Sequence, residues 1–429
     1  MLNIPRSSGI LASPASLPGR FGMGEIGQEA HRWLETLRTM GQRVWLMPPL
    51  GPLDAARTPG SLASAFAGDP LLVSFESLRN DGALLPQDLA MIPSFRADHI
   101  ETGPVREVRM AFLKLASRRF LAQCDSSPLL RRAFDYFCEN EAAAWLDDHA
   151  MYAVLSEKHG PAREGWPEGL ARRERAALDE AKPALAMEIE EQKVLQFFFH
   201  RQWIRLRAKA KELGIHLAMD LPLPVPAASA DAWAGQSLFD AGQPGHTQAM
   251  TTARWHEHED SGFAWWRSRA RKMLGWVDAL RLTGASAIPA AEFEKLATAL
   301  RGELGAHVPL LVDESATDPA LAAAAARHGI APTHVLPAAP EMAGAVTEHS
   351  LALGIGRLGG MESKEAIASL LRAKSRLAIT AIPSLVSLAP GATLQVPEDA
   401  PWNWRFEWDH LPAETQGFIL RLARETERF

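Results

Sequence analysis

The sequence predicts an α/β protein built on a parallel β-sheet. Short apolar runs rich in β-branched residues alternate with longer segments of helical periodicity, and this alternation is typical of repeated strand–helix units. The length of 429 residues fits two or three ordinary domains, or one α/β barrel enlarged by an insertion. A long helical stretch in the first half of the chain favours the enlarged barrel.

The apolar runs predict seven strands, whereas a closed barrel of this type needs eight. The predicted strands are Ser8–Pro14, Arg43–Met47, Ile215–Leu221, Ala279–Thr283, Val308–Asp313, Thr333–Leu336 and Leu377–Ile382. Further along the chain, Gly354-Ile-Gly-Arg-Leu-Gly359 is a weak match to the dinucleotide-binding pattern G-x-G-x-x-G. We discount that match because no strand clearly precedes it.

Residues 105–213 have a different texture, with helical periodicity and little that resembles strand. The predicted helical segments are Met110–Gln123, Pro128–Leu155, Gly169–Ala181 and Ala186–Glu212. This stretch is too long for one barrel helix. We therefore predict a helical insertion or subdomain at 105–213, packed against the barrel.

Composition and charge exclude several classes of protein. The net charge of −6 argues against general nucleic-acid binding, which needs a basic surface. Two cysteines provide no disulfide framework, and this fits a reducing cytoplasm. No apolar run resembles a signal peptide or a membrane span. His256-Glu-His258 lacks the spacing and third ligand of a zinc site, so we predict no metal and no cofactor.

Several motifs follow one another in the order of a known enzyme family. Arg6-Ser-Ser-Gly-Ile-Leu is similar to R-x-S-G-x-L, Gly22-Met-Gly-Glu-Ile-Gly27 to G-I-G-D-L-G, and Ser64 to Leu72 to S-A-F-A-G-N-P-L-L. Leu195 to Trp203 is similar to F-L-Q-F-x-F-x-R-Q-W, and Gly262 to Trp266 to G-Y-x-W-W. These are motifs of the amylomaltases, or 4-α-glucanotransferases, which this chain resembles over most of its length.

The resemblance implies one TIM (β/α)8 barrel over residues 1–429, with the helical insertion, and a role in α-1,4-glucan or maltooligosaccharide metabolism. Family members transfer glucan segments with retention of configuration. That reaction needs one carboxylate as nucleophile and a second carboxyl group as acid and base. In a β/α barrel such groups lie at the carboxyl ends of the strands.

The chain departs from the family at these catalytic positions. Trp276 to Ala285 resembles F-D-x-V-R-I-D-H-F, but Thr283 stands in the position of the nucleophilic Asp. Val308 to Ala316 resembles L-P-I-I-A-E-D-L-G, and Asp313 takes the position of the acid/base Glu, with Glu314 after it. Because side chains alternate along a strand, Asp313 and Glu314 do not both face the barrel mouth unless the strand ends between them.

Two further positions differ at the last predicted strand. Leu377 to Ser384 aligns with V-x-Y-T-G-T-H-D, whose His and Asp contact the sugar in the transition state. Pro383 and Ser384 stand there instead, and proline has no side-chain donor. The family segment with G-x-P-P-D-Y-F-S and G-Q-x-W-G-N-P is also absent between Gly245 and Ser261.

Retained polar residues have both a functional and a structural interpretation. Arg281 and Asp220 occupy substrate-binding positions, and Arg281 could bind an anionic group. The structural interpretation pairs Arg281 with Asp220 or Asp313, because a buried charge needs a partner. Asp231, which follows Ser229, is interpreted as a loop or helix cap.

Three functions from different classes remain open. The preferred hypothesis is a catalytically impaired pseudoenzyme that binds α-glucan or a protein partner. The second is an active 4-α-glucanotransferase in which Asp313 or Glu314 is the acid/base and Asp220 or Asp278 replaces the nucleophile. The third is a barrel enzyme with a different reaction built on Asp313, Arg281 and Asp220.

Overall fold

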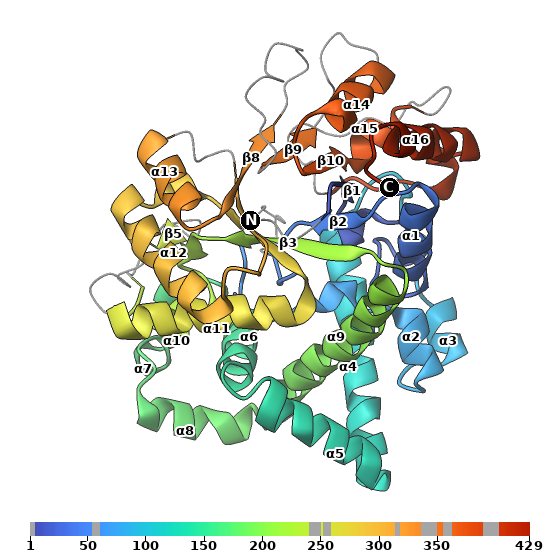
Figure 1. Cartoon of the computed structure of the whole chain (residues 1–429). Coiled ribbons are helices and arrows are strands. Elements are labelled where there is room, and N and C mark those ends of the chain that lie inside the picture. The colour runs from blue at the N-terminus through green and yellow to red at the C-terminus, as the bar shows by residue number, and fades with distance from the viewer. Residues whose placement is uncertain are drawn as a thin grey trace.

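The computed structural model describes residues 5–53, 61–239, 250–251, 259–313, 318–335, 350–354, 363–388 and 403–429. Within this part of the chain, eight parallel strands close into a barrel in the order β1-β10-β9-β8-β7-β6-β3-β2 (Figure 1). The strands are β1 Ser7–Leu11, β2 Val44–Met47, β3 His216–Pro222, β6 Ala279–Thr283, β7 Leu310–Val312, β8 Ala331–Val335, β9 Leu351–Gly354 and β10 Leu377–Ala381. The predicted (β/α)8 fold class is confirmed.

The strand that sequence reasoning missed is β9. It is only four residues long, Leu-Ala-Leu-Gly, and all four residues are buried. Because it contains no β-branched residue, the propensity that marked the other strands gave no signal. The statement that no strand precedes Gly354 was therefore wrong, since Gly354 is the last residue of β9.

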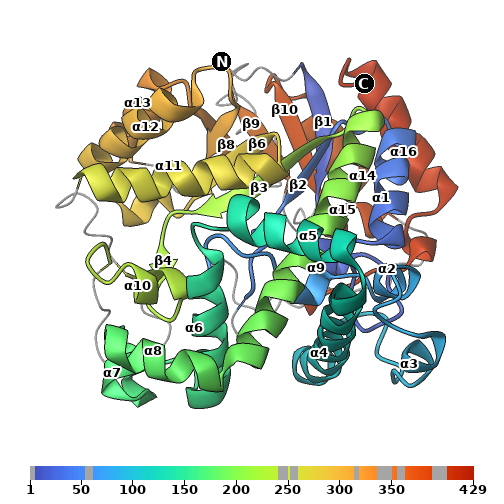
Figure 2. The ribbon, with the colours of Figure 1, turned by 90° about the horizontal axis from the view of Figure 1, so that it is seen from below.

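Helices surround the barrel on all sides in the two views of the molecule (Figures 1 and 2). They are α1 Gln28–Thr39, α2 Phe75–Asn80, α3 Pro86–Ala90, α4 Thr102–Ser126, α5 Pro128–Tyr136, α6 Leu146–His159, α7 Glu168–Ala171, α8 Arg175–Ala184, α9 Ala186–Glu212, α10 Ala230–Ala234, α11 Glu259–Trp276, α12 Ala290–Leu304, α13 Pro319–Arg327, α14 Ser363–Arg372, α15 Ile382–Val386 and α16 Ala413–Glu425. A short antiparallel pair, β4 Val225–Pro226 and β5 Met250–Thr251, lies outside the barrel.

The connection between β2 and β3 contains α4 to α9, which gather on one side of the barrel (Figure 2). The helix predicted at Pro128–Leu155 is divided into α5 and α6 by a π-helical turn, Phe137–Glu141. Phe134 and Phe137, on either side of this junction, both pack against Phe197 of α9, with ring centroids 5.5 Å apart in each pair. Helical periodicity alone does not reveal such a turn. The division into a barrel and a subdomain at 105–213 stays a prediction.

The barrel interior is filled by alternate residues of the strands, as the twofold period of a β-strand requires. The apolar cluster inside the barrel includes Leu11, Leu46, Ala218, Ala279, Leu311, Leu353 and Ile379. Side chains at further alternate positions of β3 and β6 face the same interior, closer to the carboxyl end. This alternation decides which polar residues reach the barrel mouth.

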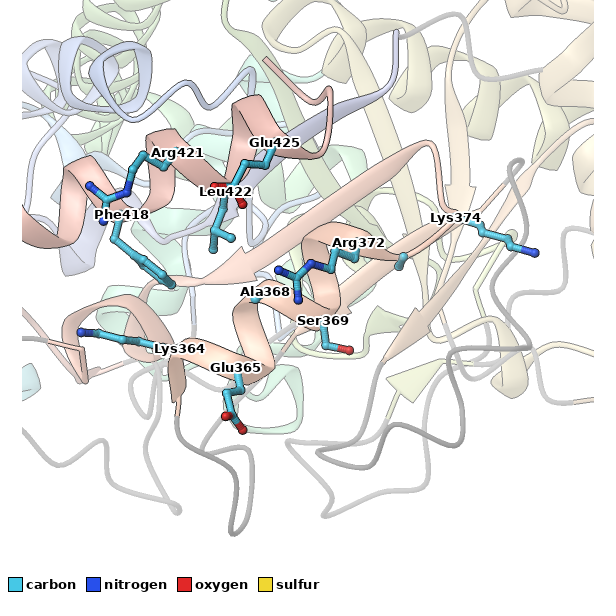
Figure 3. Close-up of a pocket in the computed structure, with 11 residues that line it drawn as sticks. Lys364, Glu365, Ala368, Ser369, Arg372, Lys374, Phe418, Arg421, Leu422 and Glu425 are labelled. Carbon is cyan, nitrogen blue, oxygen red and sulfur yellow. The ribbon is translucent and has the colours of Figure 1, made fainter.

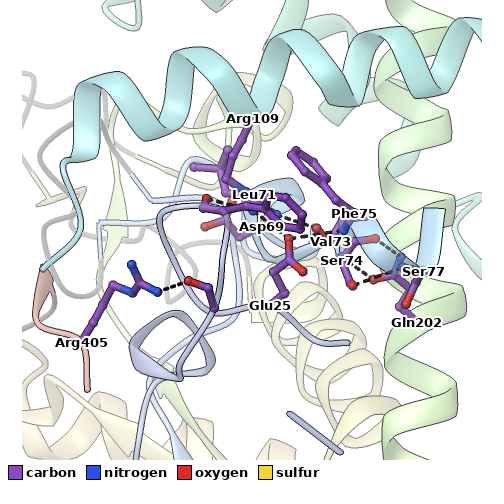
Figure 4. A network of polar contacts seen from close by, with 12 residues as sticks. Glu25, Asp69, Leu71, Val73, Ser74, Phe75, Ser77, Arg109, Gln202 and Arg405 are labelled. Atoms are coloured by element: carbon purple, nitrogen blue, oxygen red, sulfur yellow. Dashed lines mark hydrogen bonds and ion pairs between the residues drawn. The ribbon is translucent and has the colours of Figure 1, made fainter. Parts of the chain in front are cut away.

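A buried ion pair ties the outer helices to the segments that follow the first strands (Figure 4). Arg109 of α4 is fully buried and donates hydrogen bonds to Glu25 Oε1 at 2.8 Å and to the carbonyl oxygen of Val73 at 2.6 Å. Burial raises the pKa of Glu25, and the Arg109 guanidinium opposes that shift. Because a buried carboxylate needs a partner, the Glu25–Arg109 pair fixes α4 against the amino-terminal part of the barrel.

Candidate active site at the barrel mouth

Four of the residues predicted from the sequence face the barrel interior together. Ala218, Ala279 and Leu311 belong to the interior cluster. Asp220 lies two residues after Ala218 on β3. Likewise Arg281 and Thr283 lie two and four residues after Ala279 on β6, and Asp313 lies two residues after Leu311, directly beyond β7. These three strands are neighbours in the barrel, so strand alternation brings the four side chains to one sector of the mouth.

Arg281 and Asp220 form a buried bidentate ion pair. They are direct neighbours in the register of β6 and β3. Arg281 Nε donates to Asp220 Oδ1 at 2.7 Å, and Arg281 Nη2 donates to Asp220 Oδ2 at 2.8 Å. Both residues are about 7% exposed. The structural interpretation of Arg281 is confirmed for Asp220 as the partner.

The charge state of Asp220 reflects three influences. Burial raises the pKa of Asp220, Arg281 lowers it, and the negative charge of Asp313 raises it further. Asp313 follows β7, and β7, β6 and β3 are successive strands of the barrel, so its carboxyl group lies in the same sector of the mouth. Since the two Arg281 hydrogen bonds are short and favour the carboxylate form, the pair is best described as ionic.

Asp313 is held at the rim by the backbone of the neighbouring strand. Its Oδ2 accepts a hydrogen bond from the N–H of Gly284 at 2.7 Å, and its own N–H donates to the carbonyl of Leu282 at 2.9 Å. Gly284 has a φ of 73°, in the left-handed region that favours glycine. β7 ends at Val312, so Asp313 lies directly at the carboxyl end of this strand. Glu314 lies outside the described residues.

Thr283 is the last residue of β6 and is half-buried. It lies directly before the Gly284 N–H that binds Asp313, and it is registered with Pro222 of β3. A threonine hydroxyl is not ionised near neutral pH, in contrast to a carboxylate. At this position the side chain is therefore a neutral hydrogen-bonding group beside the Asp313 carboxylate.

Pro383 and Ser384 lie on the other side of the barrel. β10 is separated from β7 by β8 and β9. The chain turns into α15 at Ile382, so Pro383 occupies the first turn of this short helix and Ser384 is buried in it. Proline suits a first helical turn because its missing N–H is not needed there. The two positions thus serve the local fold.

Asp278 is in the wrong place to replace the nucleophile. It precedes β6, at the amino end of the strand, where its Oδ2 accepts from the N–H of Leu217 at 2.9 Å. Arg207 Nη2 lies 3.5 Å from Asp278 Oδ1. Thr283 lies five residues after Asp278, at the opposite end of the strand and about 16 Å away. The alternative that used Asp278 as a nucleophile was therefore wrong.

Sequence reasoning missed a set of buried polar residues that position the segment after β2. Asp231 Oδ2 accepts from the N–H of Ala65 at 2.6 Å, and the Gln196 side chain both accepts from and donates to the backbone of Gly68, at 2.9 Å each way. The helix cap at α10 is Ser229, whose hydroxyl accepts from Ala232 N–H. The helix-cap interpretation of Asp231 was wrong because Ser229 is the cap, whereas the carboxylate of Asp231 accepts a hydrogen bond from a backbone N–H of the loop after β2.

Arg269 of α11 supports the mouth from outside. It is buried, and its Nη1 donates to the carbonyl of Pro222 at the end of β3, at 2.7 Å. Burial lowers the pKa of Arg269 to about 10, and Asp231 opposes the shift. The Gly262 to Trp266 motif precedes it, and its guanidinium lies over Trp265 and Trp266. That motif was the only available signal for this arginine.

No group of three or more metal-ligating side chains comes together in the described part of the chain. His256 and His258 lie outside it. Similarly, no helix of the described residues is long and apolar enough to cross a membrane.

The sequence itself matches the family model described as 4-alpha-glucanotransferase over residues 12–283. This chain belongs to the 4-alpha-glucanotransferase family. A 4-alpha-glucanotransferase of Thermus thermophilus is 32% identical over 66% of this chain and 58% of its own length. One of Aquifex aeolicus is 33% identical over 65% of this chain and 59% of its own length. The chain thus spans about three fifths of the length of these curated relatives.

Solved structures resemble the fold over a wider range. The amylomaltase from Streptococcus agalactiae in complex with acarbose matches with a TM-score of 0.87 and 21% identity, covering 99% of both chains. The amylomaltase from Corynebacterium glutamicum matches with a TM-score of 0.70 and 15% identity, over 99% of this chain and 75% of that one. The family match in sequence ends at Thr283, whereas the likeness in fold includes the remaining strands.

Proposed function

We propose that this member of the 4-alpha-glucanotransferase family does not carry out efficient glucan transfer and acts by binding α-1,4-glucan or a protein partner. One observation carries the proposal: a hydroxyl, Thr283, stands at the end of β6, and both described carboxylates of this sector are engaged. Asp220 is held by Arg281, and Asp313 is held by the Gly284 N–H.

The chemistry of the family explains why this arrangement matters. A retaining transfer needs a carboxylate that attacks the sugar carbon and a second carboxyl group about 5–5.5 Å away that protonates the leaving oxygen. Asp313 occupies the acid/base position, but Thr283 without an adjacent base is a weak nucleophile. Positioned donors supply much of the barrier lowering in such enzymes, and Pro383 has none to offer.

Glucan binding has its own support in the geometry of the mouth. The segment after β2 is fixed by Asp231 and Gln196, and the end of β3 is fixed by Arg269. A mouth whose walls are held by buried polar contacts is preorganised for a ligand whether or not chemistry follows. Acarbose is bound by the Streptococcus agalactiae amylomaltase, so acarbose and maltodextrin are suitable probes.

The test incubates the chain with maltotriose at high protein concentration and separates the products. We expect no glucose and no longer oligosaccharides. Calorimetry with acarbose and maltodextrin then measures binding, for which we expect saturable heat. Formation of glucose together with maltopentaose by the unmodified chain would overturn the proposal, and an absence of any glucan binding would overturn its glucan-binding part in favour of a protein partner.

Variants at the mouth separate the mechanisms. Thr283→Asp alone is expected to remain inactive because the positions of Pro383 and Ser384 still lack sugar-binding side chains. Thr283→Val is the matched control for loss of the hydroxyl without a new charge. Should the unmodified chain prove active, Asp220→Asn and Asp313→Asn identify the carboxylates: an active enzyme with non-standard carboxylates loses activity in both.

A barrel enzyme with a different reaction remains the second candidate, because Asp220, Arg281 and Asp313 do lie together at the mouth. Such an enzyme would bind a small anionic substrate at Arg281 in competition with Asp220. Anion binding at the mouth that Arg281→Met abolishes, without any glucan binding, would favour this candidate.

A further inference from the structure

A groove lies on the outside of the barrel, between α14 and α16 (Figure 3). Its volume is about 860 Å³, within the range of about 300–1,000 Å³ that is typical of small-molecule sites. One face of α14 and one face of α16 form its walls. The residues that line it are Lys364, Glu365, Ala368, Ser369, Arg372, Ala373, Lys374, Phe418, Arg421, Leu422 and Glu425.

Positive side chains dominate this α14–α16 groove although the whole chain carries a net charge of −6. Lys364 and Arg372 come from α14, Arg421 from α16, and Lys374 follows α14, against Glu365 and Glu425 as the acidic residues. Figure 3 shows Lys364, Arg372 and Arg421 on the groove side, with Lys374 pointing away from them.

The three groove-side cations form no ion pair with another side chain of the described residues. Other arginines of the chain, such as Arg109, Arg281 and Arg428, are engaged with carboxylates or carbonyl oxygens. Among the described residues, by contrast, no hydrogen bond or ion pair within 4 Å engages the side chains of Lys364, Arg372 or Arg421. All three side chains are exposed, so they are accessible to an anionic ligand.

The floor of the groove is apolar. Ala368 and Leu422 are buried, and Phe418 is half-buried, with Lys364 Nζ 5.8 Å from its ring centroid. The small side chain of Ala368, four residues from both Lys364 and Arg372, leaves the space between the helices open. A ligand here meets cations at the rim and a phenyl ring below.

We propose that the α14–α16 groove binds a small organic phosphate ester. Two guanidinium groups on facing helices suit a phosphate dianion, because arginine presents paired donors in a planar fork that matches phosphate oxygens. Phe418 and Leu422 provide an apolar surface for the organic part. The four basic side chains of the groove outnumber its two acidic ones, so charge complementarity favours a phosphate ester over a neutral glucan.

This groove is separate from the barrel mouth. Lys374 lies three residues before Leu377, the first residue of β10, so the Arg372 end of the groove is near the amino ends of the strands. Asp313 and Thr283 are at the carboxyl ends. A ligand of the groove therefore regulates or anchors the protein and does not take part in chemistry at the mouth, and the proposal does not depend on the proposed function.

The test measures binding of glucose 1-phosphate and of inorganic phosphate by calorimetry, with glucose as the neutral control. We expect glucose 1-phosphate to bind, glucose not to bind, and added salt to weaken binding. Arg372→Gln and Arg421→Gln should each reduce affinity by about 10-fold or more, because a hydrogen bond to a charged group commonly contributes that much.

Arg424→Gln is the matched control, since Arg424 is an exposed arginine of α16 that lies over Phe429 and outside the groove. The affinity of Arg424→Gln for glucose 1-phosphate should stay within about 2-fold of that of the unmodified chain, a change that is small on the affinity scale. Equal losses in Arg424→Gln and Arg421→Gln would overturn the proposal, as would equal binding of glucose. Binding of an acidic peptide but of neither phosphate compound would also overturn it. Maltodextrin binding should be unchanged in all three variants, and this separates the groove from the mouth.

Discussion

Residues 12–283 and residues 284–429 resemble the 4-alpha-glucanotransferase family in different ways, the first in sequence and the second in fold. The first region matches the family model in sequence and contains buried polar contacts that tie its segments together, such as Arg109 with Glu25 and Gln196 with Gly68. The second region completes the barrel with β7 to β10 but lies outside that sequence match, and it contains Asp313, Pro383 and Ser384. Apolar burial preserves a strand through many substitutions, whereas a catalytic position depends on one functional group.

The largest expected effect is a loss of stability in the first region, residues 12–283. Arg109→Met leaves the Glu25 carboxylate buried without a cation, and it removes the donor to the carbonyl of Val73. We expect a loss of about 3–5 kcal/mol in the free energy of unfolding, measured by urea titration. Arg106→Met, an exposed arginine of the same helix, should change it by less than about 1 kcal/mol. Equal effects would show that the Glu25–Arg109 pair is not what stabilises this region.

A smaller loss of stability is expected for a substitution near the boundary between the two regions. Arg281→Met leaves Asp220 without its partner, and we expect a loss of about 2–4 kcal/mol, since water at the mouth partly solvates the exposed carboxylate. The double variant Asp220→Leu/Arg281→Met should recover most of this loss because no unpaired charge remains. Thermal unfolding measures the stability of the single and the double variant. A double variant as unstable as the single one would mean that the pair itself provides the stability.

Gly284→Ala tests the first residue beyond the family match. The added Cβ would lie 2.8 Å from Pro224 Cδ, and the φ of 73° disfavours any residue with a side chain. We expect a loss of about 1–3 kcal/mol, measured by denaturant titration. Gly302→Ala in α12, where a Cβ meets nothing within 4 Å, should instead be neutral or slightly stabilising. Two losses of equal size would contradict the conformational argument.

The smallest effect concerns the pH dependence set by Asp231. Burial raises the pKa of Asp231 to about 6, so the folded state binds more protons than the unfolded state between about pH 4 and pH 6. The free energy of unfolding contributed by this group therefore falls as pH rises through that window and is lost above it.

Asp231→Asn should flatten this window. An amide oxygen still accepts from Ala65 N–H, so we expect a net gain of about 1 kcal/mol at pH 8, measured by thermal unfolding from pH 4 to pH 8. The exposed Asp318→Asn is the control. An unchanged pH slope in Asp231→Asn would show that Asp231 keeps its ordinary pKa.

The sequence could predict only those features of the site that follow from motifs and from the alternation of side chains along a strand. Asp220, Arg281, Thr283 and Asp313 were identified from motifs, and their common orientation follows from the twofold period of their strands. The cross-links were not predictable. Asp231 binds Ala65, 166 residues away, and Gln196 binds Gly68, 128 residues away, and no local pattern encodes such partners. The strand β9 was not predicted because Leu-Ala-Leu-Gly is as compatible with a helix as with a strand.

The sequence by itself determined the family, the parallel barrel, and the chemical identity of Thr283, Asp313, Pro383 and Ser384, because motifs and periodicity are local properties of the chain. Only the tertiary structure decided that Asp220 forms an ion pair with Arg281, that Asp278 lies at the amino end of its strand, and that three cations of α14 and α16 line one groove. Those facts depend on which residues approach one another across the barrel and between helices. Such distances arise from the closure of the sheet and the packing of its helices, which no single segment contains.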